Sequence, residues 1–310
     1  MRDDKVKLCF FGTGTSQGVP IIGCQCETCL SSNPKDKRLR ASALVEYGPL
    51  KILVDAGPDF RFQMLRAGVS DLDAILLTHS HRDHTGGLDD LRALNYINKR
   101  AVEIFCESNV LEELKKEYPY AFEEIKYPGA PEWNINIIDE RPFFLKQADK
   151  GKELVWLHGK GYVYKDRNGN ISPRETNNIS EAQMSENGEE AHIVIPIRGH
   201  HGMLPVLGFR FGNIAYITDM SSIEDSELLK LKGLKHLTLN TVSYSPHHSH
   251  FCLEEAVELA GKIGAEHTWL THLSHSFPVY EQFCKELQRL RSEKGLQTEI
   301  LPAYDGLIIE

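Results

Sequence analysis

The chain has 310 residues, of which 41% are hydrophobic and 25% charged, the composition of a globular protein with a sizeable core. Its formal net charge of −9 argues against a protein that coats nucleic acid, because neutralising phosphates requires clustered lysine and arginine. No apolar run approaches the roughly 20 residues of a membrane helix, and the charged start of the chain lacks the apolar stretch of a secretory signal. We therefore expect a cytoplasmic protein.

Short apolar runs and helical patterns alternate along the first half of the chain. Gly48 and Pro49 separate two apolar runs in the manner of a hairpin turn, while Gly68 and Pro119 mark helix ends. The pattern predicts strands at residues 6–11, 41–47, 50–55, 74–77 and 102–106, and helices at 60–67, 88–97 and 109–118.

The second half repeats this alternation after a polar segment at about residues 150–190, which we expect to be an exposed insertion containing a tight turn at 165–170. Two β-rich halves with interleaved helices indicate an α/β protein whose sheets are covered by helices. No linker-like segment divides them, so we expect one domain over residues 1–310. Strands are predicted at 193–197, 206–211, 214–218, 236–240, 268–271 and 307–309, and helices at 228–231, 253–263 and 283–290.

Three histidines and an aspartate lie close together at the end of a predicted buried strand. His79 and His81 are two positions apart, so extended backbone points both side chains to the same side. Asp83 and His84 follow a bend in the chain and are placed to reach a second ion. Imidazole and carboxylate donors suit zinc, iron and manganese. The run therefore predicts a site for divalent metal ions.

A two-ion site needs more donors than this run supplies, and three further strand ends offer them. Asp219 follows residues 214–218, where its carboxylate is placed to bridge both ions. His272 follows another predicted strand, and His201 comes shortly after a third. Each residue alone also fits a strand cap, but together they indicate a ligand set. We prefer His201 to its neighbour His200, which we expect beside the site or in solvent.

A second metal site is indicated by three cysteines in one loop. Cys24, Cys26 and Cys29 have the spacing of thiolates that bind zinc. A tetrahedral zinc ion needs a fourth donor, and His275, three residues after His272, is placed to supply it. Such a closed Cys3His site is structural rather than catalytic. The alternative is three free cysteines in an exposed loop.

These motifs give the chain a resemblance to a known family. In order, it shows a glycine-rich loop at 12–18, Asp55 after a strand, the histidine run at 79–87, a middle histidine, Asp219 and a late histidine. This order resembles the metallo-β-lactamase-fold phosphodiesterases over nearly the whole chain. The cysteine loop together with the late His-x-x-His pair is similar to the phosphoribosyl 1,2-cyclic phosphodiesterase branch of the phosphonate pathway.

The resemblance implies an αββα four-layer sandwich, with the metal site along one edge of two packed sheets. It implies two divalent ions, zinc or manganese, in that site, and one structural zinc in the cysteine loop. The resemblance assigns His79, His81, His201 and Asp219 to one catalytic ion, and Asp83, His84, Asp219 and His272 to the other.

His250 is expected to serve catalysis rather than metal binding. It precedes a predicted helix, beside His247 and His248, and neutral imidazole can both accept and donate a proton near pH 7. By resemblance it fits the family's phosphate-contacting general acid, and the alternative is a solvated histidine at a polar helix entry. Asp83 is the other residue assigned to catalysis, and Asp55 is expected to orient a metal-bound histidine.

The predicted activity is hydrolysis of a small phosphodiester, cyclic or linear, by a hydroxide activated between two ions. Two alternatives stay open on the same fold, an RNA 3′-processing nuclease and a thioester or lactam hydrolase. A non-enzymatic relative is disfavoured by the complete ligand set. The expected partner is the small-molecule substrate, with nucleic acid disfavoured and no membrane, and a homodimer stays open as the oligomeric state.

Overall fold

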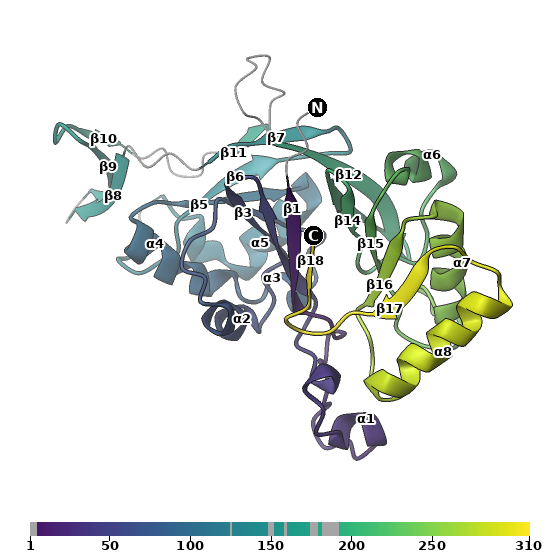
Figure 1. The fold of residues 1–310 in the computed structure, drawn as a ribbon. Coiled ribbons are helices and arrows are strands. Elements are labelled where there is room, and N and C mark those ends of the chain that lie inside the picture. The colour runs from purple at the N-terminus through teal and green to yellow at the C-terminus, as the bar shows by residue number, and fades with distance from the viewer. Residues whose placement is uncertain (1–4, 125, 148–151, 158–159, 174–178, 182–191) are drawn as a thin grey trace. The chain divides into compact units, whose positions relative to one another are not determined.

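The computed structural model describes residues 5–124, 126–147, 152–157, 160–173, 179–181 and 192–310 (Figure 1). The packing of the chain divides it into two compact units. Unit 1 comprises residues 1–48, 140–142 and 193–310, and unit 2 comprises residues 49–139 and 143–192. The expectation of one domain over the whole chain stays a prediction.

Unit 1 contains two groups of strands in the part of the chain that the structure describes. In the first, β1 (Val6–Gly12) runs antiparallel to both β2 (Ser42–Tyr47) and β18 (Ile308–Ile309). The second has the order β17-β16-β15-β14-β13-β12, in which β14 to β17 are parallel. The carboxyl ends of these parallel strands therefore meet at one edge. The strands are β12 (His192–His201), which enters unit 1 at Ile193, β13 (Leu204–Phe211), β14 (Ile214–Tyr216), β15 (His236–Asn240), β16 (His267–Thr271) and β17 (Glu299–Pro302).

Two helices cover one face of these parallel strands, α7 (Leu253–Ile263) and α8 (Tyr280–Glu293) (Figure 1). The buried residues of α7 recur at helical spacing, which gives the helix one apolar stripe toward the sheet. Gly264 ends α7 in left-handed backbone, with φ 71°. The core of unit 1 lies between the helices and the strands and includes Ala256, Val257, Ala260, Phe283 and Leu287 against Leu237, Leu239 and Leu270. The other helical segments of unit 1 are α1 (Glu27–Leu30), α6 (Asp225–Leu228) and the 3-10 turns Pro34–Asp36 and Leu229–Leu231.

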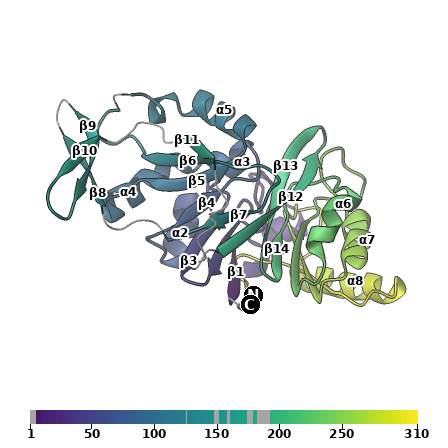
Figure 2. The ribbon, with the colours of Figure 1, turned by 90° about the horizontal axis from the view of Figure 1, so that it is seen from above.

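Unit 2 is built on a parallel sheet of order β11-β6-β5-β4-β3, whose strands β4, β5, β6 and β11 lie side by side in Figure 2. Parallel neighbours require crossover connections, and helices provide several of them. The strands are β3 (Leu50–Val54), β4 (Ala74–Leu76), β5 (Val102–Cys106), β6 (Trp133–Ile137) and β11 (Ile179–Glu181), with β7 (Phe143–Leu145) also in this unit. The helical segments are α2 (Phe60–Ala67), α3 (Arg82–Thr85), α4 (Arg92–Asn98), α5 (Ser108–Glu117) and the 3-10 turns Leu88–Leu91 and Pro119–Ala121.

Most of the described part of the predicted insertion forms a small antiparallel sheet of β8 (Lys152–Leu157), β9 (Gly161–Asp166) and β10 (Ile171–Pro173), whereas β11 pairs with β6. The backbone N–H groups of Asn168 and Asn170 donate to Oδ1 of Asp166, at 2.9 and 2.8 Å, which confirms the predicted turn. The remaining residues of the insertion, at 150–151, 158–159, 174–178 and 182–191, lie outside the described residues.

Most predicted elements are confirmed, with shifted ends. The helix predicted at 88–97 is a 3-10 turn followed by α4, and the strand predicted at 193–197 continues as β12 to His201. Among the described residues, no helix combines the length and the apolar character that crossing a membrane requires.

Candidate metal centre

In unit 2, the predicted histidine run follows β4 and converges. We call His79, His81, Asp83 and His84 the unit 2 cluster. The ring centroid of His79 lies 4.7 Å from that of His81 and 4.3 Å from that of His84. His81 precedes the short helix α3, which carries Asp83 and His84, so the chain turns within the run. The structure thus brings the three imidazoles of this run together.

Asp55 and Thr78 orient two of these histidines. Asp55 is buried directly after β3, and Nδ1 of His84 donates to its Oδ2 at 2.7 Å. Thr78 donates to Asp55 through its backbone N–H and its hydroxyl, both at 2.9 Å, and the Thr78 hydroxyl lies 2.9 Å from Nδ1 of His79. With Nδ1 held on each ring, Nε2 is the atom that each presents to an ion. Burial raises the pKa of Asp55, and the neighbouring His84 opposes this shift.

Unit 1 presents its predicted donors at the carboxyl ends of its strands. His201 is the last residue of β12, Asp219 follows β14 and His272 follows β16 directly. Nε2 of His272 lies 3.0 Å from Oδ1 of Asp219, and Nδ1 of His201 donates to the Asp219 carbonyl at 3.2 Å. Asp219 and His272 have φ values of 56° and 57°, a left-handed backbone that non-glycine residues rarely adopt. Such strain is concentrated at functional sites.

His250 joins these donors from the loop before α7. We call His201, Asp219, His250 and His272 the unit 1 cluster. The His250 ring lies 4.5 Å from that of His201 and is stacked at 4.7 Å on that of His272. Its Nδ1 is 3.7 Å from Oδ1 of Asp219. Burial, reinforced by the neighbouring His272 ring, lowers the pKa of His250 to about 3, so the His250 imidazole is neutral at pH 7 in the ligand-free protein. Sequence reasoning placed His250 in catalysis and missed its closeness to the metal donors.

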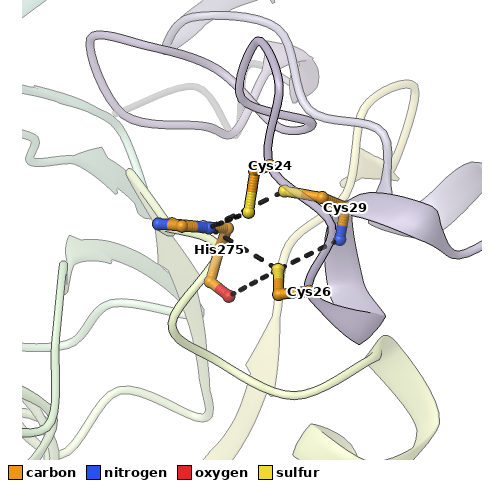
Figure 3. A group of neighbouring side chains, drawn as sticks. All are labelled: Cys24, Cys26, Cys29 and His275. Atoms are coloured by element: carbon orange, nitrogen blue, oxygen red, sulfur yellow. Dashed lines mark hydrogen bonds between the residues drawn. The ribbon is translucent and has the colours of Figure 1, made fainter.

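The three cysteines and the late histidine come together within unit 1, as Figure 3 shows. The sulfur atoms of Cys24, Cys26 and Cys29 lie 3.2, 3.5 and 3.7 Å from Nδ1 of His275. All four donor atoms lie within 4.8 Å of one another. Four converging donors of this kind fit the closed tetrahedral geometry of structural zinc.

Backbone groups of the same loop approach two of these sulfurs. The N–H of Cys29 donates to Sγ of Cys26, and the N–H of Ile21 donates to Sγ of Cys29, both at 3.4 Å. The first of these bonds, with His275 contributing, lowers the pKa of Cys26 to about 6, whereas burial raises that of Cys29 to about 11. The loop therefore favours at least one thiolate, the form that binds metal.

A buried arginine that sequence reasoning missed holds the neighbouring glycine-rich loop. Arg38 donates to the hydroxyl of Thr13 at 2.8 Å and to the carbonyl of Ala303 at 2.6 Å. Asp305 accepts from the same hydroxyl at 2.8 Å and from the N–H of Leu39 at 2.9 Å. These contacts anchor the start of the loop through Thr13, and the loop lacks the lysine of a phosphate-binding P-loop.

The fold and the donor clusters define a class of protein, which comparison with known proteins bears out. Residues 51–273 match the β-lactamase superfamily domain, so the chain belongs to the β-lactamase superfamily. The predicted α/β metallo-β-lactamase fold and the prediction of a superfamily hydrolase are thereby confirmed. The fold implies divalent metal ions as cofactors.

Two relatives resemble the chain along nearly all of its length. A diphosphatase of the PhnP family is 31% identical with a TM-score of 0.74, and the match covers 99% of this chain and 98% of that one. The octanoyltransferase of Porphyromonas gingivalis is 34% identical over 97% of this chain but 51% of its own length, so the chain spans about half of that relative.

A third relative matches a smaller part of the chain. The ribonuclease Z of Methanopyrus kandleri is 40% identical over 18% of this chain and 20% of its own length.

Proposed function

We propose that the chain is a phosphodiesterase that uses two divalent ions to hydrolyse a small phosphodiester, cyclic or linear, to a monoester. The observation that carries the proposal is the 31% identity to a diphosphatase of the PhnP family over 99% of this chain. That relative is named for hydrolysis at phosphorus, and the imidazole and carboxylate donors of both clusters suit ions that activate water for such a reaction. Zinc and manganese are the proposed catalytic metals, because mixed imidazole and carboxylate donors suit both.

The residues present fit such ions. Each cluster offers imidazole and carboxylate donors, and the orienting bonds from Asp55 and Thr78 supply the outer contacts that metal-bound histidines characteristically have. The proposed ligands are His79, His81, His201 and Asp219 for one ion, and Asp83, His84, Asp219 and His272 for the other.

The chain's own residues have three tasks in this proposal. Bound divalent ions supply an activated water nucleophile and neutralise charge on the phosphoryl oxygens. Asp55 and Thr78 hold His84 and His79 in the required tautomers. His250 is proposed to protonate the leaving alkoxide. For this role His250 must first be protonated, which its burial disfavours. A phosphodiester anion bound beside the ring would raise the pKa of His250 and so favour the protonated form.

The Cys24, Cys26, Cys29 and His275 group is proposed as a structural zinc site. A closed set of four protein donors leaves no position for substrate. The ion would join the loop at residues 24–29 to the segment that follows His272, and thereby steady a proposed catalytic ligand.

A substrate panel tests the proposed function. The purified protein, loaded with zinc or manganese, is assayed on bis-(p-nitrophenyl) phosphate, a ribose cyclic phosphate, precursor tRNA, an acyl thioester and a lactam. We expect the highest kcat/KM on one of the two phosphodiesters and loss of that activity on chelation. Faster turnover of the thioester or the lactam contradicts the proposal, and 3′ processing of tRNA at comparable rates points to the nuclease alternative.

One relative favours a second candidate, chemistry on an acyl group. The octanoyltransferase of Porphyromonas gingivalis contains a region similar to this chain, although half of that protein lies outside the match. The thioester arm of the panel decides between the two candidates. The short match to ribonuclease Z and the net charge of −9 give the RNA alternative less support.

Replacing His250 separates proton donation from metal binding. If His250 protonates the leaving group, His250→Ala lowers kcat/KM on the ribose cyclic phosphate by about 10²–10⁴-fold, the range of general acid catalysis. The loss on the p-nitrophenyl diester is much smaller, because p-nitrophenolate leaves without a proton. Equal losses on both substrates indicate positioning of the phosphate instead, and no loss on either contradicts a catalytic role.

A further inference from the structure

His201, Asp219 and His250 hold their donor atoms close together within unit 1. One nitrogen of each imidazole and one carboxylate oxygen of Asp219 all lie within 4.8 Å of one another. Donors bound to a tetrahedral zinc ion at about 2.0–2.2 Å are about 3.4 Å apart. Nδ1 of His250 is already 3.7 Å from Oδ1 of Asp219, so small side-chain movements bring the three donors to that spacing.

The environment of His250 favours a bound cation. Its side chain is 12% exposed, and its Nδ1 makes no hydrogen bond to any residue in the described part of the chain. A buried polar nitrogen without such a bond is destabilising unless another partner is supplied. Oδ1 of Asp219 lies 3.7 Å from this nitrogen, and a divalent ion bound by both groups would supply the partner that Nδ1 of His250 lacks.

Three local contacts hold these donors in place before any ion arrives. The Thr218 hydroxyl donates to Oδ2 of Asp219 at 2.6 Å. The His201 ring is held through Nδ1 by the carbonyl of Asp219, which leaves its Nε2 to face an ion. The N–H of Phe251 donates to the carbonyl of Met220 at 2.8 Å and fastens the His250 loop beside the Asp219 segment.

We infer that the unit 1 cluster binds one divalent ion by itself, with His201, Asp219 and His250 as ligands and water completing the coordination. The proposal for the fully loaded enzyme adds His79 and His81 as ligands of this ion, which leaves His250 to act as the proposed proton donor. The unit 1 cluster thus needs no donor from unit 2 to hold an ion. This inference rests on the proposed function only through the shared ligands His201 and Asp219.

The test removes the donors of unit 2 and measures metal binding rather than activity. The triple variant His79→Ala/His81→Ala/Asp83→Ala keeps His84, which is buried against Asp55. The full-length variant, with zinc retained in the cysteine loop, is titrated with Co²⁺. Thiolate-bound Co²⁺ absorbs strongly in the near ultraviolet and is counted separately.

We expect the triple variant to bind about one Co²⁺ outside the cysteine loop. Adding His250→Ala should weaken this binding at least about tenfold. Loss of even an outer contact of a metal site typically lowers metal affinity by about 10–100-fold, and His250 is proposed as a direct ligand. Adding His248→Ala is the matched control and should leave the affinity unchanged, because His248 is an exposed histidine of the same loop. The inference is overturned if the folded triple variant binds no Co²⁺, or if His250→Ala and His248→Ala have the same effect.

A second measurement decides the question if the triple variant does not fold. The otherwise wild-type protein, with zinc retained in the cysteine loop and its other ions removed, is titrated with Co²⁺. The affinity for at least one Co²⁺ should fall with His250→Ala and not with His248→Ala. The same affinity in both variants overturns the inference. Failure of the proposed function is distinguishable, because a protein that binds Co²⁺ as expected but cleaves no phosphodiester contradicts only the proposed activity.

Discussion

Asp219→Ala is expected to remove nearly all hydrolysis together with at least one metal equivalent. Asp219 is the proposed bridging ligand, its side chain is 2% exposed, and its Oδ1 lies 3.0 Å from Nε2 of His272. Loss of several kcal/mol of charge stabilisation from a bound ion corresponds to a fall in kcat/KM of about 10³-fold or more. The measurements are kcat/KM on the preferred phosphodiester and metal content by elemental analysis.

Two further variants make this result specific. Asp219→Asn removes the charge but keeps a residue type that tolerates the left-handed backbone at φ 56°, so it should lose metal and activity while the fold persists. Asp225→Ala, at an aspartate whose side chain is 86% exposed, should change neither. Full turnover and full metal content in Asp219→Asn would show that the two-ion assignment is wrong.

Cys26→Ser is expected to lower thermal stability and zinc content while the catalytic ions stay bound. Binding of structural zinc is coupled to folding, so removal of one of four ligands takes away folding free energy. A loss of about 3 kcal/mol corresponds to a fall in Tm of about 5 °C or more in a protein of this size. The measurements are the Tm and the zinc content of the purified protein.

Cys284→Ser is the matched control for this variant. Cys284 is a free cysteine of intermediate exposure on α8, outside the cysteine loop. Its replacement should leave the zinc content unchanged. Equal zinc content and equal Tm in Cys26→Ser and the wild type would rule out a structural metal at the cysteine loop.

Elements with strong local signals could be predicted from the sequence. The helix predicted at 253–263 has the bounds of α7, because Glu255 caps its first turn and Gly264 closes it with φ 71°. The helix predicted at 60–67 has the bounds of α2 for a similar reason, since Gly68 ends it with φ 64°. In these places local backbone preference and tertiary structure agree.

Elements that depend on their neighbours could not be predicted. β12 continues four residues beyond its predicted end because residues up to His201 pair with the start of β13. β17 was missed, since its short sequence ends in Pro302 and becomes a strand only by pairing with β16. β6 was also missed, and it is a strand through its parallel pairing with β5.

In the candidate site, too, the features with local sequence signals could be predicted and those that depend on tertiary packing could not. The spacing of the unit 2 cluster and of the cysteine loop is local, so the sequence predicted both groups. The position of His250 beside Asp219 depends on how the loop before α7 packs against the segment after β14, which no local pattern encodes. The distinction between a ligand and a catalytic group at His250 could therefore not be made from the sequence.

The group at the cysteine loop also has a topological consequence. Cys24 and His275 are 251 positions apart, so a zinc ion bound by both closes most of the chain into a ring. Because the site forms only when the chain folds, a bound ion would add its binding free energy to the folded state, and the stability of the ring would rise with the free zinc concentration. The ion would act as a reversible cross-link between two distant segments of unit 1, and chelation would open the ring without breaking any covalent bond.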